Sequence, residues 1–261
     1  MKMNMKRLVG SLSALGLAGQ VSCVSDRDGY LVVQQMQPLD EACQYSTDEE
    51  TLLTSGILDL AVGRSYLLFP RVENNIQDVT VVQQFQETDA RINTKDVTIT
   101  RARIAFTTQD EISAEIPNRD VRLSGTVPTA GSAILPLEVL TPTDLATLRA
   151  ADQFLVIGAD GVRPARASVD LTVNVQFFGE TADGNEVESN NFDFSLRVCN
   201  GCLISFPFDC ADGAVPDAAA TEAEAGGFCA NLPGQDRSFN CAQCNAFAVD
   251  PIARQLCIQA R

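Results

Sequence analysis

Residues 167–177 alternate strictly between apolar and polar side chains. Every odd position is apolar, and every even position between the two ends is polar. A period of two places alternate side chains on opposite faces of a β-strand, so this stretch predicts a strand with one buried face. Residues 192–198 repeat the pattern, and Asp183-Gly184 between the two stretches suits a tight turn. The chain therefore contains a β-hairpin that runs directly into Cys199-Asn-Gly-Cys202.

Shorter apolar runs along the chain predict further strands. They lie at residues 30–33, 57–60, 66–69, 79–85, 96–106, 133–140 and 154–157, with two more within 111–127 that are broken by Pro117-Asn118 and Gly125. Short strands separated by turn signals about every ten residues are typical of antiparallel sandwiches. Pro70 indicates that the run before it ends there or lies at a sheet edge. The predicted fold class is all-β, an antiparallel β-sandwich of immunoglobulin-like or jelly-roll-like type.

The run at 96–106 does not keep a single phase. Val97 and Ile99 share one face of an ideal strand, whereas Ile104 and Phe106 share the other. An extra residue switches the face, so a β-bulge near Thr100 would reconcile the two halves. The alternative is a strand whose two faces are both partly covered.

One short helix is predicted between the strands. Thr141-Pro-Thr-Asp144 resembles a capping box with proline at the first helical position. Leu145 and Leu148 share a face, and we expect the helix to end before Phe154. No long helices alternate with the strands, which disfavours a doubly wound α/β fold.

Composition excludes several kinds of chemistry. The chain has no histidine, so it cannot form a Ser–His–Asp triad. Its formal charge is −15 and it has no basic stripe, so we expect no nucleic-acid partner. No spacing singles out a catalytic pair of carboxylates, so we predict no enzyme and keep a carboxylate-based hydrolase as a lesser alternative. Asp183, Asp209 and Asp212 are calcium candidates in the alternative of a glycan- or calcium-binding module.

The N-terminus has the pattern of an export signal. Residues 1–7 are basic, and residues 8–21 are apolar and uncharged. The residues before Cys23 resemble a bacterial lipobox, which predicts a lipidated cysteine. Gln20 stands where an aliphatic residue is usual, so simple secretion is the first alternative and a buried N-terminal helix the second. The predicted organisation is a signal peptide at 1–22, a lipidated tether at 23–29, the β-sandwich at 30–209 and a cysteine-rich tail at 210–261.

Eight cysteines remain when Cys23 is assigned to the lipid. An exported chain meets an oxidising environment, so we expect these cysteines to form disulfides and predict no metal and no cofactor. We expect Cys43 to pair with the Cys199–Cys202 region, joining the first and last parts of the sandwich. The alternatives are a four-thiolate zinc site, or a redox role for either Cys-x-x-Cys pair. The eight residues are Cys43, Cys199, Cys202, Cys210, Cys229, Cys241, Cys244 and Cys257.

Four segments and the lipobox-like start resemble uncharacterised lipoproteins of predatory and fruiting soil bacteria of the myxobacterial type. The segments are Gly56-Ile-Leu-Asp59, Tyr66…Pro70…Asn74, Val198-Cys-Asn-Gly-Cys-Leu203 and Cys229…Gly234-Gln-Asp236…Cys241. The resemblance implies a cell-envelope location and carries no activity. We therefore expect an exported, non-catalytic envelope lipoprotein with a structural or binding role, held on a membrane by its lipid. We expect the outer membrane as its location, with the periplasm or secretion as alternatives, and a protein or glycan partner at the cell surface.

Overall fold

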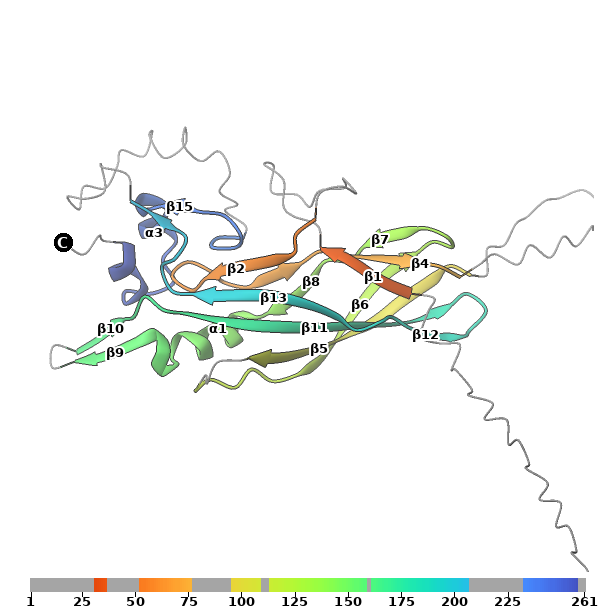
Figure 1. Cartoon of the computed structure of the whole chain (residues 1–261), viewed down its shortest axis with the longest axis horizontal. Coiled ribbons are helices and arrows are strands. Elements are labelled where there is room, and N and C mark those ends of the chain that lie inside the picture. Colours follow the sequence, from red (N-terminus) through yellow and green to blue (C-terminus); the bar gives the residue numbers. More distant parts are fainter. Residues whose placement is uncertain are drawn as a thin grey trace, which may run out of the picture.

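The computed structural model describes residues 31–36, 52–76, 95–108, 113–158, 161–206 and 232–257, with the backbone alone for 34–36 and 156–158. The described chain is mostly β-strand, arranged as two layers, with a small cysteine-rich module at one end (Figure 1). The predicted all-β sandwich is thus confirmed. The signal peptide, the tether, the strand expected at 79–85, Asp209 and Asp212 lie outside the described residues.

The first layer is a six-stranded sheet in the order β2-β13-β11-β5-β6, with β12 paired to β11. The hairpin predicted from the alternating stretches is its centre, and Val173 of β11 lies opposite Phe194 of β13. Neighbours are antiparallel except β2 and β13, which run parallel. The strands are β2 (Ser55–Asp59), β5 (Val97–Thr108), β6 (Arg119–Val127), β11 (Ser168–Thr181), β12 (Glu186–Glu188) and β13 (Phe192–Cys199).

The bulge predicted near Thr100 is confirmed. The register between β5 and β6 shifts between Ile99 and Arg101. Val97 and Ile99 before the shift are buried, and Ala102 and Ile104 after it are buried as well. The extra residue therefore returns the second half of β5 to the core face.

The second layer consists of two small sheets, in the orders β1-β4-β7 and β3-β8. Pro70 does end the preceding run, because β3 stops at Leu68, yet it also begins a new strand between β1 and β7. The first position of a strand is one that proline tolerates. Residues 113–118 form no strand, and residues 132–140 divide into two. The strands are β1 (Leu31–Met36), β3 (Tyr66–Leu68), β4 (Pro70–Asn74), β7 (Ser132–Ile134) and β8 (Leu137–Leu140).

The predicted helix is present as α1 (Pro142–Arg149). Both bonds of the capping box form, since the Thr141 side chain accepts from the backbone N–H of Asp144 and the Asp144 carboxylate accepts from that of Thr141. Leu145 and Leu148 are buried in the sandwich core. A short 3-10 helix, η1 (Asp152–Phe154), and the hairpin β9 (Leu155–Gly158) and β10 (Gly161–Pro164) follow.

The cysteine-rich module gathers at the end of the sandwich where β2 and β13 finish (Figure 1). It has its own small cluster of buried side chains, to which Ile204, Phe239 and Leu256 contribute. It contains a second short helix that the sequence did not predict. Its elements are β14 (Ile204–Ser205), β15 (Phe239–Asn240), α3 (Cys241–Phe247) and the 3-10 helix η3 (Ala253–Cys257).

Candidate functional site at the junction of sandwich and module

The segment Gly234-Gln-Asp236 fastens the module to the edge of the sandwich. The backbone N–H of Asp59 donates to the carbonyl of Gly234 at 2.8 Å, and the N–H of Asp236 donates to the carbonyl of Ile57 at 2.9 Å. The segment therefore pairs with β2 as a short additional strand would, and Leu58 and Gln235 form an antiparallel bridge. This pairing covers backbone groups that an open sheet edge would expose.

The side chains of this segment reinforce the pairing. The buried amide of Gln235 forms two hydrogen bonds with the backbone of Leu67, at 3.0 Å to its N–H and 2.7 Å to its carbonyl. The Asp236 carboxylate accepts from the backbone N–H of Ile57 at 2.7 Å and from the hydroxyl of Tyr66 at 2.8 Å. One tripeptide thus joins β2 to β3. In the sequence, the resemblance to the lipoproteins was the only reason to single out this tripeptide. The residues around it do not indicate that it contacts β2 and β3.

Tyr66, which is buried, and Asp236, which is partly buried, form a hydrogen-bonded acid pair. Burial raises the pKa of Tyr66 well above its ordinary value, and the neighbouring carboxylate of Asp236 raises it further. Burial also raises the pKa of Asp236, although the N–H of Ile57 and the hydroxyl of Tyr66 lower it in part. The proton therefore stays on Tyr66, and the pair serves as a fixed hydrogen bond.

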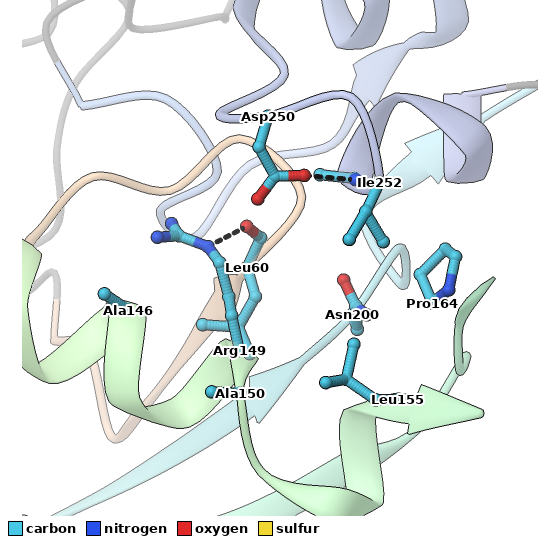
Figure 2. A pocket seen from close by; sticks show the side chains of 10 residues that line it. Leu60, Ala146, Arg149, Ala150, Leu155, Pro164, Asn200, Asp250 and Ile252 are labelled. Atoms are coloured by element: carbon cyan, nitrogen blue, oxygen red, sulfur yellow. Dashed lines mark hydrogen bonds between the residues drawn. The ribbon is translucent and has the colours of Figure 1, made fainter. Parts of the chain in front are cut away.

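A pocket of about 300 Å³ lies where α1, the β9–β10 hairpin and the module meet (Figure 2). Its walls are mostly apolar, and three polar residues reach it, namely Arg149, Asn200 and Asp250. The apolar residues are Leu60, Ala146, Ala150, Leu155, Pro164, Ile252 and Ala253. Apolar walls with a few placed polar groups are typical of small-molecule sites.

The polar residues of the pocket are held in fixed positions. The Nε of Arg149 donates to the carbonyl of Leu60 at 2.9 Å, and one Nη also donates to that of Gly63. Burial lowers the pKa of Arg149, and the nearby Asp250 carboxylate offsets part of that effect. Asp250 accepts from the backbone N–H of Ala253 at 2.7 Å. The pocket therefore presents a charged guanidinium group, with the Asp250 carboxylate nearby, beside apolar walls.

The described cysteines are joined in disulfides. Cys199 pairs with Cys202, with Cα atoms 5.9 Å apart, and Cys244 pairs with Cys257. Cys241, at the start of α3, is also disulfide-bonded. The expectation that Cys43 pairs with the Cys199–Cys202 region is wrong, because these two sulfurs are bonded to each other. Cys23, Cys43, Cys210 and Cys229 lie outside the described residues.

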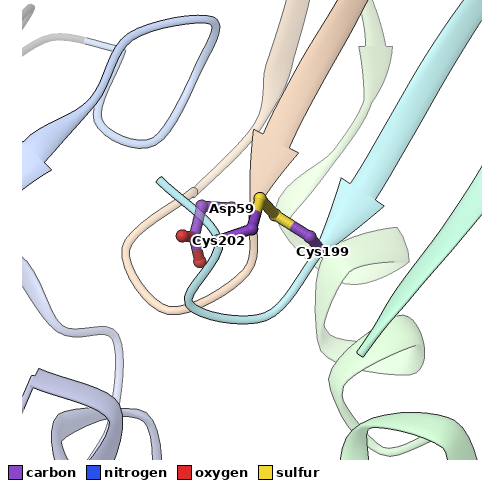
Figure 3. A group of neighbouring side chains, drawn as sticks. All are labelled: Asp59, Cys199 and Cys202. Atoms are coloured by element: carbon purple, nitrogen blue, oxygen red, sulfur yellow. A yellow bond between two sulfur atoms is a disulfide. The ribbon is translucent and has the colours of Figure 1, made fainter. Parts of the chain in front are cut away.

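The Cys199–Cys202 turn is organised around the carboxylate of Asp59 (Figure 3). Parallel pairing of β2 and β13 places Asp59 opposite Cys199. The carboxylate is fully buried and accepts from the backbone N–H groups of Gly201 at 2.7 Å, Leu203 at 2.9 Å and Ala61 at 3.0 Å. Burial raises the pKa of Asp59, and these three N–H groups offset part of the increase. Gly201 has a φ of +82°, which suits glycine at the turn.

Asp59, Cys199 and Cys202 form the one cluster of potential metal ligands within the described parts of the chain. An oxygen of Asp59 and the sulfurs of Cys199 and Cys202 all lie within 4.8 Å of one another. The sulfurs are bonded to each other, so they are not thiolates, the form that binds zinc. The four cysteines of the zinc alternative, which include Cys241 and Cys244, are all disulfide-bonded, and that thiolate set does not form.

Asp183, the calcium candidate within the described residues, is engaged by a cation. Its carboxylate accepts from Lys95 at 2.6 Å and also from the hydroxyl of Thr181. These hydrogen bonds lower the pKa of Asp183 to about 2. Asp183 thus fixes the turn between β11 and β12, where Gly184 has a φ of +84°.

Comparison with known proteins leaves the function to be inferred from the chain itself. No protein-family model, curated protein or solved structure matches the chain. Where the structure describes the chain, no helix is both long and apolar enough to cross a membrane.

Proposed function

We propose that the protein is an exported lipoprotein of the bacterial cell envelope with a non-catalytic binding role. The observation that carries the proposal is the oxidised state of the five described cysteines, which are Cys199, Cys202, Cys241, Cys244 and Cys257. Disulfides persist in oxidising compartments and are rare in the cytosol. The basic and then apolar N-terminus, followed by Cys23, supports export and a lipid anchor.

The pocket beside Arg149 supports a binding role. Its size matches the lower end of small-molecule sites, and its walls belong to both the sandwich and the module. We propose that it holds a small, mostly apolar ligand whose polar end meets Arg149. The Asp236 carboxylate supports a structural and not a hydrolytic role, because the backbone N–H of Ile57 and the Tyr66 hydroxyl already occupy it. The glycan, calcium and hydrolase alternatives stay predictions.

Mass spectrometry of the protein isolated from membranes tests the location. The expected result is a diacylglycerol on Cys23, loss of residues 1–22 and disulfides throughout the cysteine-rich part. The matched control, Cys23→Ser, lacks the lipid acceptor and should appear in the soluble fraction. Intact protein in the cytosol with an uncleaved N-terminus and reduced thiols would overturn the proposal.

Binding of anilinonaphthalene sulfonate, an apolar dye with one anionic group, tests the pocket. We expect its fluorescence to rise on binding and Ala146→Phe to abolish the rise, because the new ring fills the pocket. Thr147→Phe is the matched control, since Thr147 is exposed on α1 outside the pocket. Equal dye binding by both variants would show that the dye binds elsewhere.

A further inference from the structure

The two described disulfides differ in their exposure. Cys244 and Cys257 are both buried, with 0% and 1% of their surface exposed. In the other pair Cys199 is 0% exposed, whereas Cys202 is exposed to solvent. Cys202 therefore lies at the surface, and we expect an external thiolate to reach its sulfur without unfolding of the protein. Access to the attacked sulfur is one of the factors that set exchange rates.

The two disulfides also differ in their surroundings. A carboxylate oxygen of Asp59 lies within 4.8 Å of both sulfurs of the first pair (Figure 3). Among the residues that the structure describes, no carboxylate oxygen lies within 4.8 Å of both sulfurs of Cys244–Cys257. Opening the bond by attack at Cys202 leaves a thiolate on Cys199, which is buried. A buried thiolate without a cationic partner is unfavourable, so this sulfur needs a proton. Asp59 is placed to exchange that proton with the buried Cys199.

We propose that Cys199–Cys202 is a thiol–disulfide exchange site, at which external thiols attack Cys202 and Asp59 carries the proton of Cys199. This inference goes beyond the proposed binding role. Its substrates are thiols and disulfides, of either small molecules or other exported proteins. The raised pKa of Asp59 supports the assignment, because a carboxyl group that keeps its proton to higher pH can donate it.

The exchange balances as follows in the reducing direction. An external thiolate attacks the sulfur of Cys202, the Cys199–Cys202 bond breaks, and a mixed disulfide forms between the external sulfur and Cys202. The departing Cys199 sulfur takes the proton of the Asp59 carboxyl group. A second external thiolate then attacks the external sulfur of the mixed disulfide and releases an external disulfide and the Cys202 thiolate. Two electrons pass from the external thiols to the protein.

The oxidising direction uses the same groups in reverse. The Cys202 thiolate attacks an external disulfide, breaks its S–S bond, forms the mixed disulfide with one sulfur and releases the other as a thiolate. The Asp59 carboxylate removes the proton of Cys199, and the resulting thiolate attacks the sulfur of Cys202. The external thiolate leaves, and the Cys199–Cys202 bond is restored. Asp59 is thus a proton carrier in both directions.

Differential reduction of the native full-length protein tests the site. The protein is incubated with reduced glutathione in one arm and with a protein dithiol in the other, then alkylated and analysed by mass spectrometry. We expect Cys199–Cys202 to open at least about ten-fold faster than Cys244–Cys257, because exposure controls access. Exchange in either arm supports the site, and the faster arm identifies the source of the thiol. Equal rates for the two disulfides, or resistance of both until denaturant is added, would overturn the proposal.

Two serine variants test which sulfur is attacked, with Asp59 left unchanged. Cys199→Ser leaves the exposed sulfur, which should form a mixed disulfide with oxidised glutathione. Cys202→Ser leaves the buried sulfur, which should stay unmodified in the folded protein. The reverse result would refute attack at Cys202.

The pH profile of disulfide closure tests the role of Asp59. In the wild-type protein we expect closure of the reduced pair to depend on an ionisation that Asp59→Asn removes. Asp236→Asn is the matched control, because Asp236 is also a carboxylate that accepts backbone and side-chain hydrogen bonds at the junction. It should leave the profile unchanged. The same profile in all three proteins would exclude Asp59 as the proton carrier.

Discussion

The sandwich and the cysteine-rich module are held together by different means. The sandwich has one large core to which both layers and α1 contribute. The module is built around a cluster of seven buried residues, which includes its own Cys244 and Cys257 and also Ala61 and Val62 from the sandwich loop after β2. It is joined to the sandwich by the Gly234–Asp236 segment, the Asp59 carboxylate and Arg166, which donates to the carbonyls of Gly201 at 3.0 Å and Leu256 at 2.8 Å.

The comparison shows which interactions stabilise the module, where few apolar side chains are buried. Hydrophobic burial stabilises in proportion to area, so a cluster as small as that of the module contributes little. Disulfides restrict the unfolded chain, and buried hydrogen bonds to charged groups add stability in fixed geometry. We therefore expect the stability of the sandwich to depend most on the volume of its core side chains. The stability of the module should depend most on its disulfides and its buried hydrogen bonds.

The largest effect is expected from Phe194→Ala in β13. Phe194 is 1% exposed, and its ring centroid lies 6.4 Å from that of Tyr66. The cavity should lower the free energy of unfolding by about 3–5 kcal/mol, measured by urea denaturation. Leu52→Ala is the control, because Leu52 is 45% exposed. Similar urea midpoints for the two variants would contradict a core role for this ring.

Next in size is the removal of the Cys244–Cys257 bond by the double substitution of both cysteines to serine. The cysteines are 13 residues apart, and a loop of that size corresponds to roughly 3 kcal/mol. We expect the module to open first, so limited proteolysis should cut it while amides of β11 and β13 stay protected from hydrogen exchange. Simultaneous loss of protection in both regions would show that the module isn't a separate cooperative unit.

A smaller effect is expected from Tyr66→Phe. The Asp236 carboxylate would lose its hydroxyl donor while staying mostly buried, at a cost of about 1.5–3 kcal/mol. The chain has three tyrosines, and we expect one of them to resist ionisation in an ultraviolet titration of the folded protein. The variant should lack this resistant tyrosine. Full titration of all three tyrosines at ordinary pH values would contradict the buried pair.

Two glycines compare a crowded position with an open one. Gly234 has a φ of +75°, and a Cβ there would lie 2.8 Å from the carbonyl oxygen of Asp59. Gly184 has a φ of +84° but no atom within 4 Å of such a Cβ. We expect Gly234→Ala to cost about 2–3 kcal/mol and Gly184→Ala about 1 kcal/mol in thermal unfolding. Equal costs would mean that the Gly234 segment doesn't pack closely against β2.

The smallest effect is expected from pH, and its sign differs between the two regions. Asp236 at the junction has a raised pKa, so the folded state binds its proton more tightly and stability falls as pH rises from 3.8 through that pKa. Burial would raise the pKa of Asp144 in the capping box, but hydrogen bonds from Arg119 and Thr141 outweigh it and lower the pKa. The stability that the Asp144 carboxylate contributes is present above pH 3.8 and is lost as the pH falls through the lowered pKa.

Asparagine variants at the two positions measure these opposite slopes. As pH falls from 7 toward 4, the stability of the wild-type protein relative to Asp236→Asn should increase. Its stability relative to Asp144→Asn should decrease below about 4, because the carboxylate that accepts from Arg119 becomes protonated. Parallel slopes in urea denaturation would contradict the assigned pKa directions.

Local patterns were sufficient for the elements whose signals lie within a few residues. The alternation in β11, the phase change at Thr100 and the capping box at Thr141 are such signals, and the structure confirms all three. The junction could not be predicted, because Asp59 and Asp236 are defined by partners far along the chain. Disulfide pairing was open for the same reason, since eight cysteines allow about 105 combinations. The strand that begins at Pro70 was missed because its partners, β1 and β7, are also distant.

The covered edge of β2 has a consequence for the order of events during synthesis. The residues that close this edge come from positions 234–236, well after Cys199, where β13 ends as the last strand of the sandwich in the chain. A polypeptide emerges from the ribosome beginning with its N-terminus. The edge of β2 therefore stays open until residues 234–236 have emerged, so this part of the junction forms only after every strand of the sandwich has been synthesised.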